Sequence, residues 1–450
     1  MSVASPGDAA RLPGRTGPGA PQRVAVVGGG WAGCAAAVEL AARGAAVTVY
    51  EASRTLGGRA RAVNVHGKSL DNGQHILLGA YRETLRLMRQ VGIAERPALL
   101  RLPLQMVYPE GDGMHFVAPR LPAPLHVGLA LLRSRGLARP DKLALARFST
   151  AARWMGWQLN QDCSVSELLA RFDQTDRLVQ LMWRPLCIAA LNTPPERASA
   201  QVFLNVLRDS LGARRAASDM LLPRVDLSAL FPQRAAAYVE SRGGKVVHGV
   251  AVDTLERDGE CWRLRDAVHD AVVIATPPAQ AAALLAAHAP DLSMPAFEWE
   301  SITTVYLQYA AGLRLERPFF ALVDQPDAGC WGQFVFDRGQ LNDADAGLLA
   351  VVISASGPAL DLGNDSLPPL VAAQLAQALR MPALATPEWT RVISEKRATF
   401  ACTPALQRPS NDVGIDGLAL AGDYTAGDYP ATLESAVRSG MAAATLVARR

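Results

Sequence analysis

Glycines at fixed spacing near the start of the chain have the arrangement that binds a dinucleotide. Gly28, Gly30 and Gly33 satisfy the pattern G-x-G-x-x-G, with Trp31 and Ala32 among its variable positions. The first glycine allows a tight turn, the second lets the backbone approach a pyrophosphate, and the third lets a helix pack close to a strand. Unpaired N–H groups at the start of that helix would face the pyrophosphate. The motif therefore predicts a site for a dinucleotide cofactor.

The elements around these glycines are those that the motif requires. An apolar strand over residues 24–27 precedes them, an alanine-rich helix over residues 34–43 follows, and a second strand over residues 46–50 ends at Glu51. This βαβ order predicts a Rossmann-like domain. The Glu51 carboxylate can accept hydrogen bonds from ribose hydroxyls, and it disfavours a 2′-phosphate. A glycine turn with a purely structural role is the alternative.

The size and composition of the chain exclude several classes of protein. Its 450 residues, half of them hydrophobic, are enough for two or three domains with a large core. The net charge of +3 gives no reason to expect nucleic acid as a partner. The six cysteines are scattered, so the sequence indicates neither a metal site nor a disulfide framework. Scattered thiols favour a cytoplasmic location.

Three observations bear on targeting and membranes. Residues 1–21 are rich in Pro, Gly, Ala and Ser and lack an apolar core, so we expect a disordered leader and no signal peptide. We find no run of 18 uncharged apolar residues that would predict a transmembrane helix. Residues 119–157 combine apolar helical runs with Lys and Arg. Such helices dock on the surface of a membrane, here its cytoplasmic face, or form the core of a substrate domain.

The loop after Glu51 extends the dinucleotide motif. Gly57 and Gly58 let this loop lie close to a ligand, and Arg59 can reach a phosphate. The addition resembles the extended motif of the large FAD-binding family that includes amine oxidases, phytoene desaturases and protoporphyrinogen oxidase. This resemblance implies FAD, rather than NAD, as the cofactor.

The C-terminal segment resembles the closing FAD motif of the same family. An apolar strand over residues 417–421 leads into Gly422 and Asp423, and a helix of small residues begins near Thr432 and Leu433. The resemblance implies that Asp423 binds a ribityl hydroxyl. It also implies that the start of the helix stabilises negative charge on the reduced flavin.

Two further contacts with the cofactor follow from the resemblance alone. The segment that contains Gly73 and Gln74 corresponds to one that passes near the isoalloxazine ring in this family. The strand at Val250 corresponds to one that contacts adenine through its backbone.

Motifs at both ends of the chain predict one discontinuous domain. We expect an α/β fold in which a Rossmann-like FAD-binding domain carries an inserted α+β substrate domain, as in amine oxidases and phytoene desaturases. The FAD-binding domain would comprise residues 22–80, 213–290 and 409–450. The substrate domain would comprise residues 81–212, which are helical and apolar, and residues 291–408, which form a mixed sheet.

Internal stretches resemble a narrower family, the hydroxysqualene dehydroxylases, which are squalene-associated FAD-dependent desaturases of bacterial hopanoid pathways. These stretches are residues 70–81, 183–195, 395–404 and 421–433. The resemblance implies reductive loss of the hydroxyl of hydroxysqualene to give squalene. An external electron donor, whose identity the sequence leaves open, would supply the electrons. The apolar residues 119–157 and 177–191 suit a tunnel for this isoprenoid.

The implied reaction needs an acid that protonates the leaving hydroxyl. Asp71, His75 and Tyr429 are the candidates, and Arg397 is a candidate for orienting the substrate hydroxyl. A buried core histidine is the alternative for His75, and a solvated charge is the alternative for Arg397. Two other functions stay open: carotenoid-type desaturation or amine oxidation, and a non-catalytic isoprenoid-binding escort protein.

Overall fold

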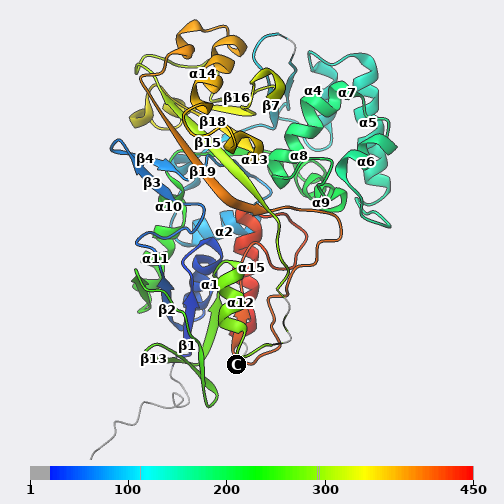
Figure 1. Cartoon of the computed structure of the whole chain (residues 1–450). Helices are drawn as coiled ribbons and strands as arrows, with labels where there is room; N and C mark the ends of the chain where they lie inside the picture. Colours follow the sequence, from blue (N-terminus) through cyan, green and yellow to red (C-terminus); the bar gives the residue numbers. More distant parts are fainter. Residues whose placement is uncertain (1–20, 112, 291, 293, 449–450) are drawn as a thin grey trace, which may run out of the picture.

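The computed structural model describes residues 21–448 apart from residues 112, 291 and 293. The leader expected over residues 1–21 lies outside the described residues except for residue 21. Figure 1 shows two lobes, with a parallel sheet and its helices below and a second sheet above, beside a group of helices. None of the described helices is both long enough and apolar enough to cross a membrane.

The lower lobe is built on a parallel sheet of five strands drawn from three distant parts of the chain. The strand order is β10 (Lys245–His248), β2 (Ala46–Glu51), β1 (Arg23–Val27), β14 (Ala271–Ile274) and β20 (Leu418–Leu420). Covering layers on both faces explain why β1 and β14 are continuous apolar runs. The Rossmann-like α/β fold expected from the sequence is confirmed.

Helices cover one face of this sheet and a small antiparallel sheet covers the other. The helices are α1 (Trp31–Ala42), α11 (Pro232–Ser241) and α15 (Leu433–Val447). The opposite layer comprises β11 (Glu256–Asp258), β12 (Cys261–Leu264) and β13 (Ala267–His269). Small residues let α1 and α15 approach closely, because a Cβ on Gly440 would lie 2.1 Å from the carbonyl oxygen of Ala32. The N-terminal and C-terminal motifs are therefore fixed to each other.

The upper lobe contains an antiparallel sheet of five strands. Its order is β16 (Phe319–Ala321), β17 (Phe334–Asp337), β18 (Leu348–Ser354), β15 (Trp299–Gln308) and β19 (Trp389–Phe400). The sheet packs one face against α14 (Leu367–Ala378). Figure 1 shows the long strands β15 and β19 descending from this sheet toward the lower lobe. They carry residues of the upper sheet down to the FAD motifs.

Helices on one side of the upper sheet form a separate cluster, which we call the helical lobe. Its members are α4 (Leu125–Arg133), α5 (Arg139–Trp154), α6 (Val165–Arg171), α7 (Asp176–Leu178), α8 (Arg184–Leu191) and α9 (Ala200–Ser210). A π-helical turn over Val179–Trp183 joins α7 to α8. At the centre of the lobe, Trp183 is buried against the ring edges of Phe148 and Phe203, and its indole N–H donates to Gln174 Oε1 at 2.9 Å.

The remaining α-helices and β-strands of the described residues are short. They are β3 (Ala62–Val65), β4 (Lys68–Asp71), β5 (Leu77–Leu78), α2 (Arg82–Gln90), α3 (Glu95–Ala98), β6 (Leu99–Leu102), β7 (Gln105–Val107), β8 (His115–Val117), β9 (Met220–Pro223), α10 (Leu227–Leu230), α12 (Pro278–Leu285) and α13 (Gly357–Leu360). Among them, α2 packs against α15 of the lower lobe, although it follows the domain boundary expected at residue 80. The domain boundaries stay a prediction.

The packing of Trp183 gives a test of the helical lobe. Trp183→Ala should leave a large cavity and an unpaired Gln174 Oε1, and lower the free energy of unfolding by about 3–5 kcal/mol. Trp183→Phe keeps most of the volume and should cost less than half as much. Thermal unfolding of both variants, compared with the parent chain, checks this. Equal melting temperatures for all three would contradict a core role for this side chain.

Candidate functional site

The three motif glycines meet different surroundings. Gly28 has a φ of +106°, and a Cβ there would lie 2.5 Å from the carbonyl oxygen of Ala275. A Cβ on Gly33 would lie 1.9 Å from the carbonyl oxygen of Gly28. Gly30 differs, since the nearest atom to its Cβ would be the Cα of Gly58, 3.9 Å away. Close backbone packing thus requires Gly28 and Gly33, while the space beside Gly30 and Gly58 admits a ligand.

The start of α1 fits a pyrophosphate. Gly30 is the N-cap residue and offers no side chain to the first-turn N–H groups, and no acidic residue lies in that turn. By contrast, polar side chains cap the starts of α6, α9 and α15. An uncapped helix N-terminus beside open space binds an anion well. Trp31 and Ala32 are buried there, and the Trp31 indole N–H donates to the carbonyl oxygen of Ala60 at 3.1 Å.

Glu51 and Val250 lie together at the carboxyl ends of neighbouring strands. The Glu51 carboxylate accepts hydrogen bonds from the backbone N–H groups of Gly29 and Ser53, both at 2.7 Å. The N–H of Val250 donates to the Glu51 carbonyl oxygen at 3.0 Å. Glu51 therefore holds the glycine loop, and lone pairs of its carboxylate that these two bonds leave unused suit ribose hydroxyls. The Val250 carbonyl oxygen is the backbone group left to contact a base.

Arg59 joins the two halves of the predicted cofactor site. Its guanidinium Nη2 lies 2.5 Å from Asp423 Oδ1, and its Nη1 donates to the Ala398 carbonyl oxygen at 2.7 Å. The side-chain amide of Asn72 donates both to the Arg59 carbonyl oxygen and to Glu395, each at 3.2 Å. The loop that contains Asn72, the strand β19 and the C-terminal motif at Asp423 thus meet around one arginine. Gly422 and Asp423 are buried beside it.

Arg397 lies beside this junction on β19. Its side chain is exposed, and its carbonyl oxygen lies 3.4 Å from Arg59 Nη1. Glu395, Lys396 and Arg397 are consecutive charges on this strand. Of the three side chains, that of Glu395 accepts a hydrogen bond from another segment, at Asn72. The structure therefore brings the backbone of Arg397 to the site.

Asp71 and Gln74 belong to a buried polar cluster above this junction. Asp71 is fully buried, its Oδ1 accepts from Leu227 N at 2.8 Å, and its Oδ2 lies 3.6 Å from Arg338 Nη1. Arg338 also pairs with Asp345 at 3.1 Å and donates to Gln74 Oε1 at 2.9 Å. Burial raises the pKa of Asp71 to about 7, against the opposing effect of Arg338. Both side chains face protein and stabilise the loop that carries Gly73.

His75 is half-buried at the end of this loop. Its Nδ1 lies 2.8 Å from the carbonyl oxygen of Gly73, so the neutral ring donates from Nδ1 and leaves Nε2 as an acceptor. Burial lowers the pKa of His75. The neutral imidazole therefore predominates at pH 7, and the imidazolium is the stronger acid when it forms.

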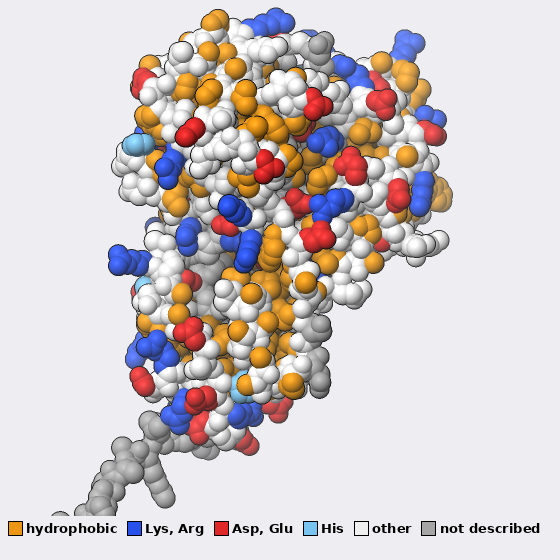
Figure 2. Space-filling view, in the orientation of Figure 1, with side chains coloured by type: hydrophobic (Ala, Val, Ile, Leu, Met, Phe, Trp, Pro, Cys, Tyr) orange, Lys and Arg blue, Asp and Glu red, His pale blue; other side chains and the backbone are white. Residues whose placement is uncertain are grey.

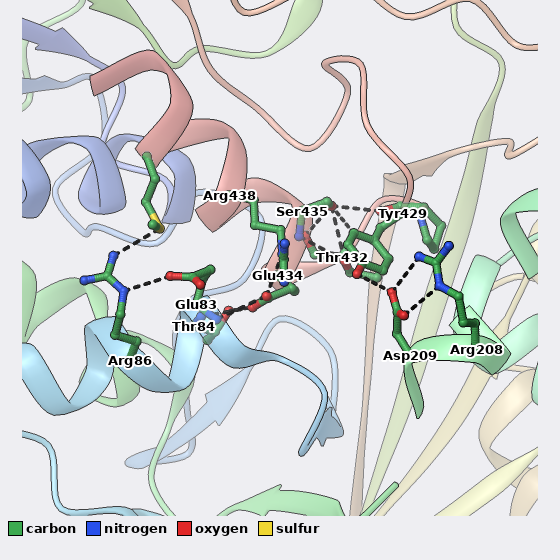
Figure 3. A network of polar contacts seen from close by, with 12 residues as sticks. Glu83, Thr84, Arg86, Arg208, Asp209, Tyr429, Thr432, Glu434, Ser435 and Arg438 are labelled. Atoms are coloured by element: carbon green, nitrogen blue, oxygen red, sulfur yellow. Dashed lines mark hydrogen bonds and ion pairs between the residues drawn. The ribbon is translucent and has the colours of Figure 1, made fainter. Parts of the chain in front are cut away.

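Figure 3 shows a polar network that runs from α2 through the start of α15 to α9. Thr432 caps α15 by accepting from Ser435 N at 3.1 Å, and Leu433 is the first helical residue. The buried carboxylate of Glu434 accepts from Thr84 N at 2.9 Å and pairs with Arg438 at 2.7 Å. The first turn of α15 is therefore held rigidly from two sides.

Tyr429 ends this network at the helical lobe. Its hydroxyl donates to Asp209 Oδ2 at 2.5 Å, and Asp209 also pairs with Arg208 at 2.8 Å. The guanidinium of Arg438 lies 5.1 Å from the ring centroid of Tyr429. Burial and the Asp209 carboxylate raise the pKa of Tyr429 to about 12. The Tyr429 phenol is therefore neutral over the physiological pH range, and its hydroxyl donates a hydrogen bond to the Asp209 carboxylate.

A cavity of about 910 Å³ lies in the helical lobe, apart from the predicted site residues. Its lining is mixed, with Met155, Leu159 and Cys163 beside charged side chains such as Glu167, Arg171 and Arg197. The predicted apolar segments contribute Met155 to it. The cavity therefore gives no direct support for a continuous apolar tunnel.

Several residues that position the candidate site residues were not predicted from the sequence. Asn72 could have been predicted, because it lies in the predicted loop that contains Gly73. A short amide side chain commonly forms hydrogen bonds that stabilise such loops. Asp209 and Arg338 carry no local signal. The one clue to Arg338 was chemical, since an Asp in an apolar setting such as Asp71 needs a cationic partner.

The cluster around Asp71 predicts a pH-dependent stability. Because burial raises the pKa of Asp71 from 3.8 to about 7, the folded chain binds more protons than the unfolded chain between these values. The free energy of unfolding should fall as pH rises through this window, by at most about 1.4 kcal/mol per pH unit. Asp71→Asn cannot ionise and should remove this part of the slope. Parallel slopes in urea titrations of both proteins would contradict the assignment.

Comparison with known proteins agrees with this geometry. A family model described as flavin containing amine oxidoreductase matches residues 31–448. Hydroxysqualene dehydroxylases are 30% identical over 94% of this chain and 98% of the relative in Rhodopseudomonas palustris, and 28% over 95% and 98% in Sinorhizobium fredii. Zeta-carotene desaturase of Synechocystis is 24% identical over 94% and 97%. The structure of putrescine oxidase bound to putrescine matches at 16% identity with a TM-score of 0.65, over 96% of this chain and 100% of that one.

These matches confirm the cofactor and the class of enzyme expected from the sequence. The likeness to putrescine oxidase, at its low identity, concerns the fold alone. The family match spans both ends of the discontinuous FAD-binding domain and the segments inserted between them. The chain belongs to the flavin containing amine oxidoreductase family, and it is an FAD-dependent oxidoreductase similar along nearly its whole length to hydroxysqualene dehydroxylases.

Proposed function

We propose that this oxidoreductase reductively removes the hydroxyl group of hydroxysqualene and releases squalene. The observation that carries the proposal is the similarity to three curated hydroxysqualene dehydroxylases, each matched over at least 94% of this chain and 98% of its own length. The substrate would be an apolar isoprenoid. An external electron donor of unknown identity would restore the reduced cofactor.

The reaction requires a fixed balance of bonds and electrons. The C–O bond breaks, the hydroxyl takes a proton and leaves as water, and a C–H bond forms at the same carbon. FAD, when bound in its reduced form, supplies the hydride. The first turn of α1 would bind the pyrophosphate of FAD, and Glu51 would bind a ribose. Arg59 would reach a phosphate, and Asp423 would bind a ribityl hydroxyl. The Gly73 loop and the start of α15 would enclose the flavin.

We propose different roles for the three candidate acids. Asp71 is fully buried against Arg338, so it would act as a positioning residue for the Gly73 loop. His75 is half-buried and has Nε2 available, so its imidazolium would donate a proton to the leaving hydroxyl. Tyr429 would do so only if it gave up its bond to Asp209. Arg397 would orient the hydroxyl after its exposed side chain turns inward.

Carotenoid-type desaturation is the second candidate. It is supported by the zeta-carotene desaturases, which match 94% of this chain at 24% identity. Both candidates imply a long apolar substrate. We propose that the enzyme works at the cytoplasmic face of the membrane, where such substrates partition. Incubation in detergent of the dithionite-reduced enzyme with hydroxysqualene, and of the oxidised enzyme with zeta-carotene and phytoene, separates the candidates: squalene as the product supports the proposal, and a desaturated carotenoid overturns it.

The pH dependence of turnover distinguishes His75 from Tyr429. If the His75 imidazolium is the acid, the rate should rise as the pH falls toward the lowered pKa of this group, and His75→Gln should abolish that rise. Tyr429→Phe should then reduce the rate less than the His75 variant does. A rate that is independent of pH in the parent chain, and lost in Tyr429→Phe, would assign the proton to Tyr429.

The pairing of Arg59 with Asp423 predicts the affinity for FAD. Arg59→Met removes a charge-assisted contact from the junction and should weaken FAD binding by about tenfold to a hundredfold. Arg61→Met, two residues away, is the matched control and should bind FAD as the parent chain does. Flavin absorbance retained after gel filtration measures both. Full retention of FAD by Arg59→Met would mean that this arginine stabilises the protein and does not contribute to FAD binding.

A further inference from the structure

The exposed faces of α4 and α5 carry large hydrophobic side chains. Four of the six exposed large hydrophobic side chains in the described part of the chain lie on these two helices. Their exposed fractions are 61% for Leu125, 73% for Leu132, 62% for Leu143 and 87% for Trp154. Clustered side chains of this kind mark a surface that meets an apolar partner.

The spacing of these residues places them on continuous stripes. On α4, Leu125 and Leu132 are seven residues apart, which is two helical turns. On α5, positions 143, 147, 150 and 154 follow the same helical period and are all exposed or half-exposed. The buried sides of both helices pack into the helical lobe through residues such as Phe148. Each helix is therefore amphipathic, with its outward stripe uncovered.

The two helices lie side by side and run in opposite directions. Lys142, in the first turn of α5, donates to the carbonyl oxygens of Leu132 and Ser134 at the end of α4, both at 2.9 Å. At the other end, the charge of Arg153 on α5 acts on His126 on α4. Figure 2 shows hydrophobic side chains beside Lys and Arg, and also beside Asp and Glu, in the region that Figure 1 labels α4 and α5.

The charge of the segment that carries this surface is strongly one-sided. Residues 119–159 contain one acidic side chain, Asp141, which is buried and accepts from Ala138 N and Thr175 Oγ1. The basic side chains of the same segment are Arg120, Arg133, Arg135, Arg139, Lys142, Arg147 and Arg153. The six arginines are exposed and form no ion pair with another described residue. Exposed arginines elsewhere, such as Arg197, do pair with carboxylates.

We propose that the outward faces of α4 and α5 bind the surface of an anionic lipid bilayer. Leu125, Leu132, Leu143 and Trp154 would enter the interface between headgroups and acyl chains, and the unpaired arginines would contact lipid phosphates. Interfacial helices have this combination of apolar anchors and basic residues, and Trp favours the depth of the headgroups. The proposal rests on the proposed function only in that an apolar isoprenoid substrate would be taken from the bilayer.

Sedimentation of the full-length holoprotein with vesicles tests the proposal. The chain should bind phosphatidylcholine vesicles that contain phosphatidylglycerol far better than vesicles of phosphatidylcholine alone, and salt should weaken this binding. Leu132→Ser with Trp154→Ser should weaken binding by about tenfold or more. Arg147→Glu and Arg153→Glu should each weaken it by at least about fivefold.

Matched controls carry the same changes elsewhere on the surface. Leu370→Ser on α14 and Arg314→Glu alter exposed side chains outside the helical lobe and should bind as the parent chain does. Unchanged flavin content verifies that every variant is folded. Equal binding by the α4–α5 variants and the parent chain would overturn the proposal, as would absence of binding to both vesicle types. A dimer in solution that Trp154→Ser dissociates would also overturn it, since a second copy would then cover this face.

Vesicle binding is measured without substrate, so its outcome is independent of the reaction. A chain that binds vesicles but forms no squalene would refute the proposed reaction alone. A chain that forms squalene in detergent but does not bind vesicles would refute the membrane surface alone.

Discussion

The ion pair between Arg59 and Asp423 holds together the part of the molecule on which the chemistry depends. The two residues are 364 positions apart, and each belongs to a motif that binds no complete cofactor by itself. Their contact requires that β1, β14 and β20 align in one parallel sheet and that α15 packs closely on α1. The same arginine also bonds to β19, which descends from the upper sheet. The cofactor site is thus completed by the fold as a whole.

A second constraint is the burial of charge behind the Gly73 loop. Arg338 contacts two carboxylates and one amide, and two of its N–H groups donate to Asp345 Oδ2. Asp71 is left with a longer contact and a raised pKa. Removing one member of such a cluster leaves another buried and unpaired, which is costly. The cluster therefore fixes the position of the loop that approaches the flavin, at the expense of stability at higher pH.

Local patterns in the sequence were sufficient to predict FAD as the cofactor. Glycine spacing, an acidic residue at the end of β2 and a Gly-Asp pair after β20 each depend on the backbone conformation of a short segment. The contacts of Asp71 and Tyr429 were not predictable in this way, because their partners Arg338 and Asp209 lie more than 200 residues away in the chain. Asp71 was singled out as an acid for its type, and its buried contacts support the positioning role that we propose for it. The sequence left open whether residues 119–157 dock on a membrane or form the core of a substrate domain. In the structure, α4 and α5 each have one buried side and one exposed side.

Hydride transfer to a substrate that loses its hydroxyl is the central claim, and a single anaerobic turnover tests it most directly. The holoprotein, reduced with dithionite and freed of excess reductant, would be mixed with hydroxysqualene while flavin absorbance and products are followed. We expect reoxidation of the flavin together with one squalene for each flavin. A flavin that stays reduced in the presence of hydroxysqualene, with no squalene formed, would contradict the claim.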